Sequence, residues 1–142
     1  MDDMFRPLRR YADFSGRASR REYWLYILLL VLLAFGVILA GMLIAIPFDS
    51  AWKAGHHIGP GGVVIFTIAA VLILALIVPT IAVQVRRLHD QDLSGWWALL
   101  NVIPYIGRLI LLVLMLRSGT DGENRFGPDP FAPDEGVAEI FA

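Results

Sequence analysis

The residues of this sequence best suited to binding chemistry are arginines that stand close to tryptophans. Arg20, Arg21 and Trp24 follow Arg17 at spacings of three, four and seven residues. On a helix that reached back to residue 17, these spacings would place all four side chains on one face. A guanidinium group donates hydrogen bonds in a planar fork that matches phosphate. The pattern therefore predicts contact with a phosphate, of a lipid headgroup or of a phosphorylated ligand.

A second group of the same residue types follows later in the chain. Arg86 and Arg87 are followed by Trp96 and Trp97, and indole rings prefer the headgroup boundary of a membrane. Each basic residue near an anionic leaflet contributes about 1 kcal/mol of attraction. Both groups would then form one basic and aromatic surface for anionic lipid. Insertion and orientation of the chain explain the same charges without any ligand, and we favour that simpler explanation.

The sequence contains one adjacent pair of a histidine and a carboxylate, His89 and Asp90. Such a pair can hold a metal ion or transfer a proton. With only Asp92 nearby the set is too sparse for a tight metal site, so we expect Asp90 to pair with Arg86 or Arg87. We predict no catalytic residue, metal site or cofactor, and the chain has no cysteine. His89 and Asp90, like Asn124 and Arg125 in the tail, are motif residues without an assigned role.

Long apolar segments must position these residues. Residues 23–48 form a run of 26 without a charge, and residues 58–85 a run of 28. About 20 apolar residues in a helix cross the hydrocarbon core. We therefore predict an all-α integral membrane protein, a small bundle of three hydrophobic helical segments. Its single membrane domain comprises spans at 23–46, 62–85 and 95–116, a basic N-terminal segment 1–21 and a turn-rich acidic tail 117–142.

The helix signals agree with this division. Ser19 and Glu22 fit a capping box at the start of the first span, and Ser94 is a candidate cap for the third. Pro79 lies inside the second span, where a kink is expected because proline donates no amide hydrogen bond.

The third segment allows two geometries, because Pro104 lies near its middle. One is a single kinked crossing, which would bring Arg108 close to the middle of the membrane at a cost of about 2.5–3.5 kcal/mol. The other is a re-entrant hairpin that turns near Pro104 and returns the tail to the side where the segment began. Of the two we favour the single crossing.

Basic residues predict the orientation of the chain. The positive-inside rule places the amino end and the connector 86–92 in the cytoplasm, and Lys53 outside with His56 and His57. The basic residues of the amino end are Arg6, Arg9, Arg10, Arg17, Arg20 and Arg21. A single crossing by the third segment would place the tail outside, whereas a hairpin would keep it inside.

Three blocks of the sequence stand in a specific order and spacing, residues 16–24, residues 86–90 with 94–97, and residues 119–120 with 122–130. Together they resemble the bacterial inner-membrane proteins of domain-of-unknown-function family 805, and the resemblance extends over residues 5–130. It implies a helical fold and a bacterial cytoplasmic-membrane location, and it brings no established activity, cofactor or catalytic residue. Arg108 departs from the apolar or small residue expected at its position.

The favoured function is that of a non-enzymatic module for lipid contact or scaffolding. The expected partners are the lipid bilayer with its anionic phospholipids, and a further copy of the chain or another membrane protein. Nucleic acid is not expected, because the arginines lie beside a span. The alternative is a transport or channel component of several copies, in which Arg108, Asn101, Gln84 and the two prolines of the spans line a hydrated path. A membrane-embedded enzyme that uses His89 and Asp90 is a more distant alternative.

Overall fold

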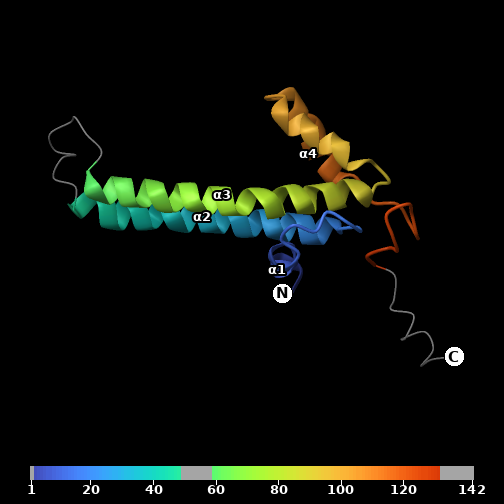
Figure 1. The fold of residues 1–142 in the computed structure, drawn as a ribbon, viewed down its shortest axis with the longest axis horizontal. Helices are drawn as coiled ribbons and strands as arrows, with labels where there is room; N and C mark the ends of the chain where they lie inside the picture. The colour runs from blue at the N-terminus through green and yellow to red at the C-terminus, as the bar shows by residue number, and fades with distance from the viewer. Residues whose placement is uncertain (1, 49–58, 132–142) are drawn as a thin grey trace. The chain divides into compact units, whose positions relative to one another are not determined.

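The computed structural model describes residues 2–48 and 59–131, and their regular structure is helical. The helices are α1 (Asp2–Arg9), α2 (Arg20–Phe48), α3 (Pro60–His89), the 3-10 helix η2 (Gly95–Val102) and α4 (Ile106–Leu116) (Figure 1). Within these two ranges, β pairing is limited to an isolated bridge between Asn124 and Gly127. The predicted all-helical class is confirmed. Lys53, His56 and His57 lie outside the described residues.

Helices α2 and α3 are long enough to cross a membrane. They contain 29 and 30 residues, which corresponds to about 43 and 45 Å of helix. Their portions Arg20–Leu43 and Gly61–His89 are apolar, yet almost none of the most apolar stretch of either is buried inside the protein. A helix that is apolar on all sides must be covered by protein or by lipid. Within the described chain these stretches are not covered, which is the pattern expected of helices that lie in a membrane.

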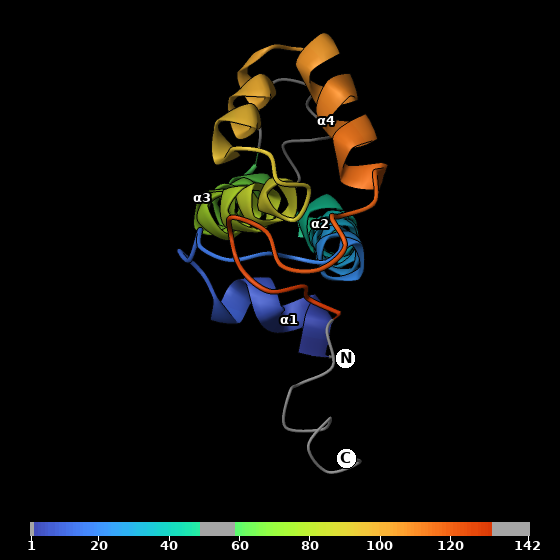
Figure 2. The same cartoon turned by 90° about the vertical axis from the view of Figure 1, so that its right-hand side faces the viewer.

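Two units make up the chain, Met1–Leu25 with Pro79–Ala142, and Tyr26–Val78. In the second unit, α2 and α3 lie side by side and antiparallel (Figures 1 and 2). A methyl group added at Gly41 would lie 3.1 Å from Cγ2 of Ile65, so a small residue at this position lets the helices approach closely. Large apolar side chains such as Phe35 and Phe66 are exposed along this unit.

Helix α2 begins directly after its predicted serine cap, whereas α3 begins two residues before the predicted span 62–85. The backbone amide of Glu22 donates to Oγ of Ser19 at 3.1 Å, which confirms the serine cap in front of α2. Helix α3 begins at Pro60, and the first helical position tolerates proline because its amide would have no partner. The helix continues through Pro79 to His89. The kink at Pro79 stays a prediction.

The third apolar segment forms two short helices joined by a turn, η2 and α4 (Figure 2). Ile103 before Pro104 has extended backbone angles, φ −86° and ψ 109°, as expected because proline disfavours a helical residue in front of it. Tyr105 then has φ 61°, which reverses the chain. A methyl group on Gly107 would lie 2.0 Å from the carbonyl oxygen of Leu100. Only glycine permits this close approach between the two helices.

Both ends of this hairpin contact the end of α3. The amide of Leu93 donates to the carbonyl of Leu88 at 3.0 Å, and Nε2 of Gln91 donates to the carbonyl of Leu114 at 2.7 Å. The segment therefore starts and finishes at the same place. The expected single helical crossing is wrong, because Pro104 ends one helix and Tyr105 reverses the chain before the next.

A small apolar core joins the hairpin to the ends of the long helices. Leu88, Leu111 and Met115 are buried together, and Tyr23 and Trp24 pack against them. Leu111 and Met115 are four residues apart on α4, as is Gly107 from Leu111, so one face of that helix is covered. The other faces of α4 carry exposed apolar side chains.

Candidate functional site

Five charged residues from the first two sequence blocks meet in the interior of the first unit. Each exposes at most 7% of its surface. We call this group the ion cluster, and its members are Arg17, Glu22, Arg86, Arg87 and Asp90. Charged side chains are almost never fully buried unless they are paired, so their partners determine what the cluster can do.

Asp90 lies at the centre of one half of the ion cluster. Its Oδ1 accepts from Nε of Arg17 at 3.0 Å and lies 2.9 Å from Nη2 of the same residue. Its Oδ2 accepts from Nη1 of Arg87. Burial raises the pKa of the Asp90 carboxyl group, while Arg17 and Arg87 act in the opposite direction. The predicted pairing of Asp90 with a neighbouring arginine is confirmed for Arg87.

The two arginines around Asp90 also bind the backbone of the tail. Arg17 donates to the carbonyl of Thr120 at 2.6 Å and to the carbonyl of Gly122. Arg87 donates to the carbonyl of Arg117. Because guanidinium groups carry five donors in a fixed arrangement, each arginine can bind a carboxylate and carbonyls together. These bonds attach the end of the hairpin to the N-terminal segment and to α3.

Glu22 and Arg86 form the other half of the ion cluster. Nη1 of Arg86 lies 3.0 Å from Oε1 of Glu22, and Arg6 of α1 approaches Oε2 at 3.7 Å. The carbonyl of Arg86 accepts from the amide of Ala18 at 3.0 Å. The side chain of Glu22 therefore binds Arg86, whereas the capping-box pattern predicted its use at the helix start.

The tail packs so closely on Asp90 that one position requires glycine. A methyl group on Gly119 would lie 2.1 Å from Oδ2 of Asp90 and 3.0 Å from its carbonyl oxygen. Beside it, the amide of Thr120 donates to the carbonyl of Asp90 at 2.8 Å. The close contact with Asp90 of the ion cluster therefore requires glycine at position 119.

The remaining motif residues hold the tail against the end of α3. Nδ2 of Asn124 donates to the carbonyl of His89 at 2.9 Å. The His89 ring stacks on Phe126 with 3.8 Å between centroids, and its Nδ1 lies 3.2 Å from the carbonyl of Gly16. Arg125 pairs with Asp92 at 2.8 Å on the exposed surface. His89, Asp90, Asn124 and Arg125 all have structural contacts within the chain.

Charge in the ion cluster is not balanced. Arg17, Arg86 and Arg87 carry three positive charges against the two negative charges of Glu22 and Asp90, which leaves an excess of one positive charge. In the part of the chain that the structure describes, Nε and Nη2 of Arg86 and Nε of Arg87 have no hydrogen-bond partner. The cluster is buried, and its charged groups bind one another and the backbone of the tail.

The structure separates the arginines and tryptophans that were predicted to share one surface. Because α2 begins at Arg20, Arg17 lies outside the helix and does not share a face with Arg20 and Arg21. Arg17, like Arg86 and Arg87, is buried. Arg20 and Arg21 are exposed, and Nε of Arg21 lies 3.4 Å from Asp3. Trp24 is half-buried against the apolar core.

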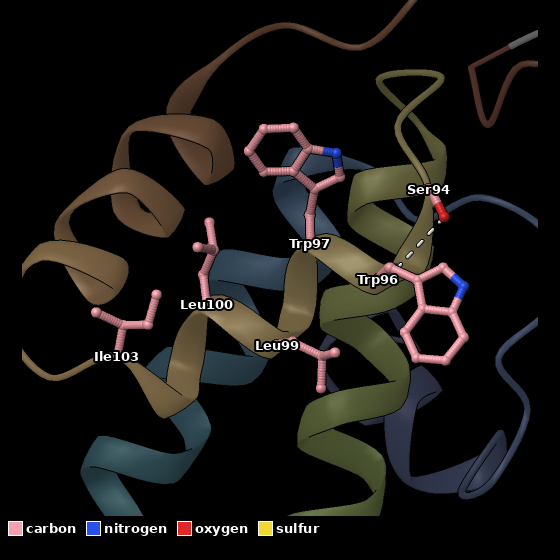
Figure 3. A pocket seen from close by; sticks show the side chains of 6 residues that line it. All are labelled: Ser94, Trp96, Trp97, Leu99, Leu100 and Ile103. Atoms are coloured by element: carbon pink, nitrogen blue, oxygen red, sulfur yellow. Dashed lines mark hydrogen bonds between the residues drawn. The ribbon is translucent and has the colours of Figure 1, made fainter.

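Trp96 and Trp97 lie on η2, at an open groove of about 430 Å³ (Figure 3). The backbone amide of Trp96 lies 3.5 Å from Oγ of Ser94, the predicted cap. The groove is almost entirely apolar, and its lining residues are Ser94, Trp96, Trp97, Leu99, Leu100 and Ile103. Farther along η2, Asn101 donates to Oε1 of Gln84 at 2.6 Å, so these two polar groups bind each other.

Sequence reasoning did not identify Glu22, Gly119 or Thr120 as parts of the site. The available signal for Glu22 was its position as the one acid among the arginines of the first block. Gly119 contributes through its close approach to Asp90, and Thr120 donates to the carbonyl of Asp90 from both its amide and its hydroxyl group. These partners lie about thirty residues earlier in the chain, so local sequence does not reveal them.

Known proteins resemble this chain along most of its length. The family described as "Protein of unknown function (DUF805)" matches residues 11–128, which contain the whole ion cluster. "Inner membrane protein YhaH" of Escherichia coli K12 is 44% identical over 130 residues, which cover 92% of this chain and 97% of that protein. "Inner membrane protein YhaI" of the same strain is 37% identical over 123 residues, 87% of this chain and 90% of that protein.

A third relative, "Uncharacterized protein YiiR" of Escherichia coli K12, is 32% identical and covers 82% of this chain and 85% of its own length. No solved structure matches the chain. The family match includes both the apolar helices and the residues that join their ends to the hairpin. The chain belongs to the DUF805 family, whose members similar to it include inner-membrane proteins of bacteria.

Proposed function

We propose that this protein is a non-enzymatic interaction module of the bacterial inner membrane. Helices α2 and α3 cross the bilayer, and the hairpin of η2 and α4 enters the cytoplasmic leaflet from the end that the ion cluster holds. The observation that carries the proposal is that an apolar hairpin ends at a buried ion cluster: Arg87 of the cluster binds the carbonyl of Arg117, and the start of the hairpin is held at the end of α3 by the bond from Leu93 to Leu88. A fixed base of this kind presents the hairpin in one position to lipid or to a membrane partner.

The dimensions of the hairpin support insertion to half the depth of the membrane. The 8 residues of η2 and the 11 residues of α4 each extend about 16 Å, against about 30 Å for the hydrocarbon core. Exposed apolar side chains cover its outer surface, including Val102, Tyr105, Ile106 and Leu109. Apolar surface of this extent requires lipid or another protein as its environment.

The proposed orientation follows from the basic residues. Arginines precede α2 and end α3, and the positive-inside rule assigns both ends to the cytoplasm. Since the hairpin returns to the same end, residues 117–131 would be cytoplasmic as well. The connection between α2 and α3 would then be periplasmic.

The contacts of His89 and Asp90 support a role without catalysis. Asp90 accepts from two arginines, and His89 is stacked and close to a carbonyl. A general acid or base must reach a substrate atom, and both groups are used within the fold. The transport alternative loses support because Asn101 and Gln84 bind each other. Arg108, another residue of that alternative, is exposed on α4 and still available for a hydrated path.

Lipid contact would fall to the exposed basic residues of the predicted surface. Arg20 and Arg21 are exposed at the start of α2, where guanidinium groups can bind headgroup phosphates. The buried residues Arg17, Arg86 and Arg87 would position this surface, because their ion pairs hold the N-terminal segment on α3. Trp96 and Trp97 at the base of the hairpin suit the headgroup boundary.

Cysteine labelling tests the topology, because the chain has no cysteine of its own. Asp121→Cys and Tyr105→Cys, at an exposed tail site and at the hairpin turn, would be treated with a membrane-impermeant maleimide. We expect the thiol of the Asp121→Cys variant to react in inside-out vesicles only. The thiol of the Tyr105→Cys variant should react in neither vesicle type until detergent is added. Reaction of the Tyr105→Cys variant in right-side-out vesicles would show a full crossing and overturn the proposal.

A further inference from the structure

The groove on η2 has the dimensions and lining of a binding site for an alkyl chain. Its volume of about 430 Å³ falls within the range of ligand sites, about 300–1,000 Å³. Trp96 and Leu99 expose 77% and 58% of their surfaces beside it. The hydroxyl group of Ser94, which also lines the groove, accepts a hydrogen bond from the backbone amide of Trp96. The groove therefore offers contact to apolar groups and little to polar ones.

The small residues of the hairpin indicate that a second helix does not fill this groove. Helices in membranes associate through small residues that let their backbones approach. Gly107 is already covered by the backbone of Leu100, and a methyl group at Gly95 would lie 2.8 Å from Val85. Outward, the groove presents bulky indole and branched side chains (Figure 3). An uneven surface of this kind is better filled by a flexible alkyl chain than by a rigid helix.

A basic residue at the end of the hairpin indicates which lipid headgroup the groove would favour. Arg117 follows α4 directly, is exposed, and its carbonyl accepts from Arg87. A cation at this end of the hairpin favours a headgroup with a net negative charge.

We propose that the groove on η2 retains one anionic phospholipid, with an acyl chain against Trp96, Leu99 and Ile103 and its headgroup near Arg117. This inference rests on the proposed function, because it requires the hairpin to lie in the cytoplasmic leaflet. It goes further in naming the ligand class and the residues that bind each end of it. A lipid held in this way would be part of the surface that the module presents to a partner.

Native mass spectrometry of the full chain tests the proposal. The protein would be released from detergent micelles that contain equal amounts of phosphatidylglycerol and phosphatidylcholine with the same acyl chains. We expect one retained lipid per chain, with phosphatidylglycerol preferred. Leu99→Trp fills the groove and should lower retention about tenfold, since a displaced stretch of alkyl chain loses its apolar contact. Leu109→Trp, at an equally exposed leucine of α4 outside the groove, should leave retention unchanged.

A second pair of variants tests the headgroup. Arg117→Gln should remove the preference for phosphatidylglycerol, while Arg108→Gln, near the opposite end of α4, should preserve it. Equal retention of both lipids by the unaltered chain would overturn the inference, as would equal loss in both leucine variants. A dimer without lipid that Leu99→Trp dissociates would overturn it too, by assigning the groove to a second copy of the chain.

The labelling experiment keeps this inference separate from the proposed function. If Tyr105→Cys is protected in both vesicle types and no lipid is retained, the groove assignment is wrong and the topology is supported. If Tyr105→Cys reacts from the periplasmic side, both proposals are wrong.

Discussion

The two units of this chain are stabilised in different ways. In Tyr26–Val78, two apolar helices pack on each other and expose large side chains along their length. In the other unit, buried arginines and carboxylates join the N-terminal segment, the end of α3 and the tail. Lipid can surround the unit Tyr26–Val78 through contacts that require only apolar side chains. The unit that contains the ion cluster depends on particular atoms, so substitutions there should have far larger effects.

Neutralising Asp90 should have the largest effect. Asp90→Asn preserves the side-chain volume but leaves Arg17 and Arg87 without their carboxylate. Removing one partner of a buried ion pair costs about 3–5 kcal/mol, so we expect loss of folded protein or a large decrease in thermal stability in detergent. Asp92→Asn, at the exposed pair with Arg125, is the matched control. Equal stability of the two variants would contradict the importance of burial.

Gly119→Ala should be the next most destabilising change. The added methyl group would lie 2.1 Å from Oδ2 of Asp90 and 3.0 Å from its backbone oxygen. Overpacking of this kind costs about 1–3 kcal/mol, and the tail should separate from α3. Limited proteolysis would detect this as faster cleavage after Arg117. Unchanged proteolysis of the alanine variant would show that the tail does not pack on Asp90.

Gly36→Ala, in the unit Tyr26–Val78, should increase stability, in contrast to the two variants above. Within the described part of the chain, no atom lies within 4 Å of a methyl group placed at Gly36 in α2. Alanine is favoured over glycine in a helix by about 1 kcal/mol, so thermal stability in detergent should increase slightly. A decrease would mean that a neighbour covers this position.

The smallest effect is expected at the exposed pair of Asp92 and Arg125. Their side chains are 41% and 67% exposed, and ion pairs in water contribute about 0.2–1 kcal/mol. Arg125→Gln should decrease the free energy of unfolding by no more than this, and high salt should reduce the difference further. A loss as large as that of Asp90→Asn would remove the distinction between the two kinds of pair.

The sequence was sufficient to predict the unit that lipid surrounds. The long uncharged runs predicted α2 and α3 because a membrane helix requires only length and apolar side chains. Ser19 and Ser94 predicted helix starts because a cap acts within a few residues. The helix α1 was not expected, since it is short, half of its residues are charged and Pro7 lies inside it.

The hairpin and the ion cluster were harder to predict, because both depend on contacts between distant residues. Pro104 was compatible with a kink or with a turn, and the close approach of Gly107 to Leu100 favours the turn. Arg17 was expected at the surface, yet it is buried by residues 120 and 122, more than 100 positions later. Residue types indicate which charges are present, but only the fold shows which of them pair.

A double-mutant cycle between Arg17 and Asp90 tests most directly whether the ion cluster holds this end of the protein together. The free energy of unfolding in mild detergent would be measured for Arg17→Ala, Asp90→Ala and the double variant. Partners in one buried network show coupling of about 0.5–3 kcal/mol, and we predict a value near the upper end. Additivity within about 0.5 kcal/mol, the behaviour of independent sites, would contradict the account.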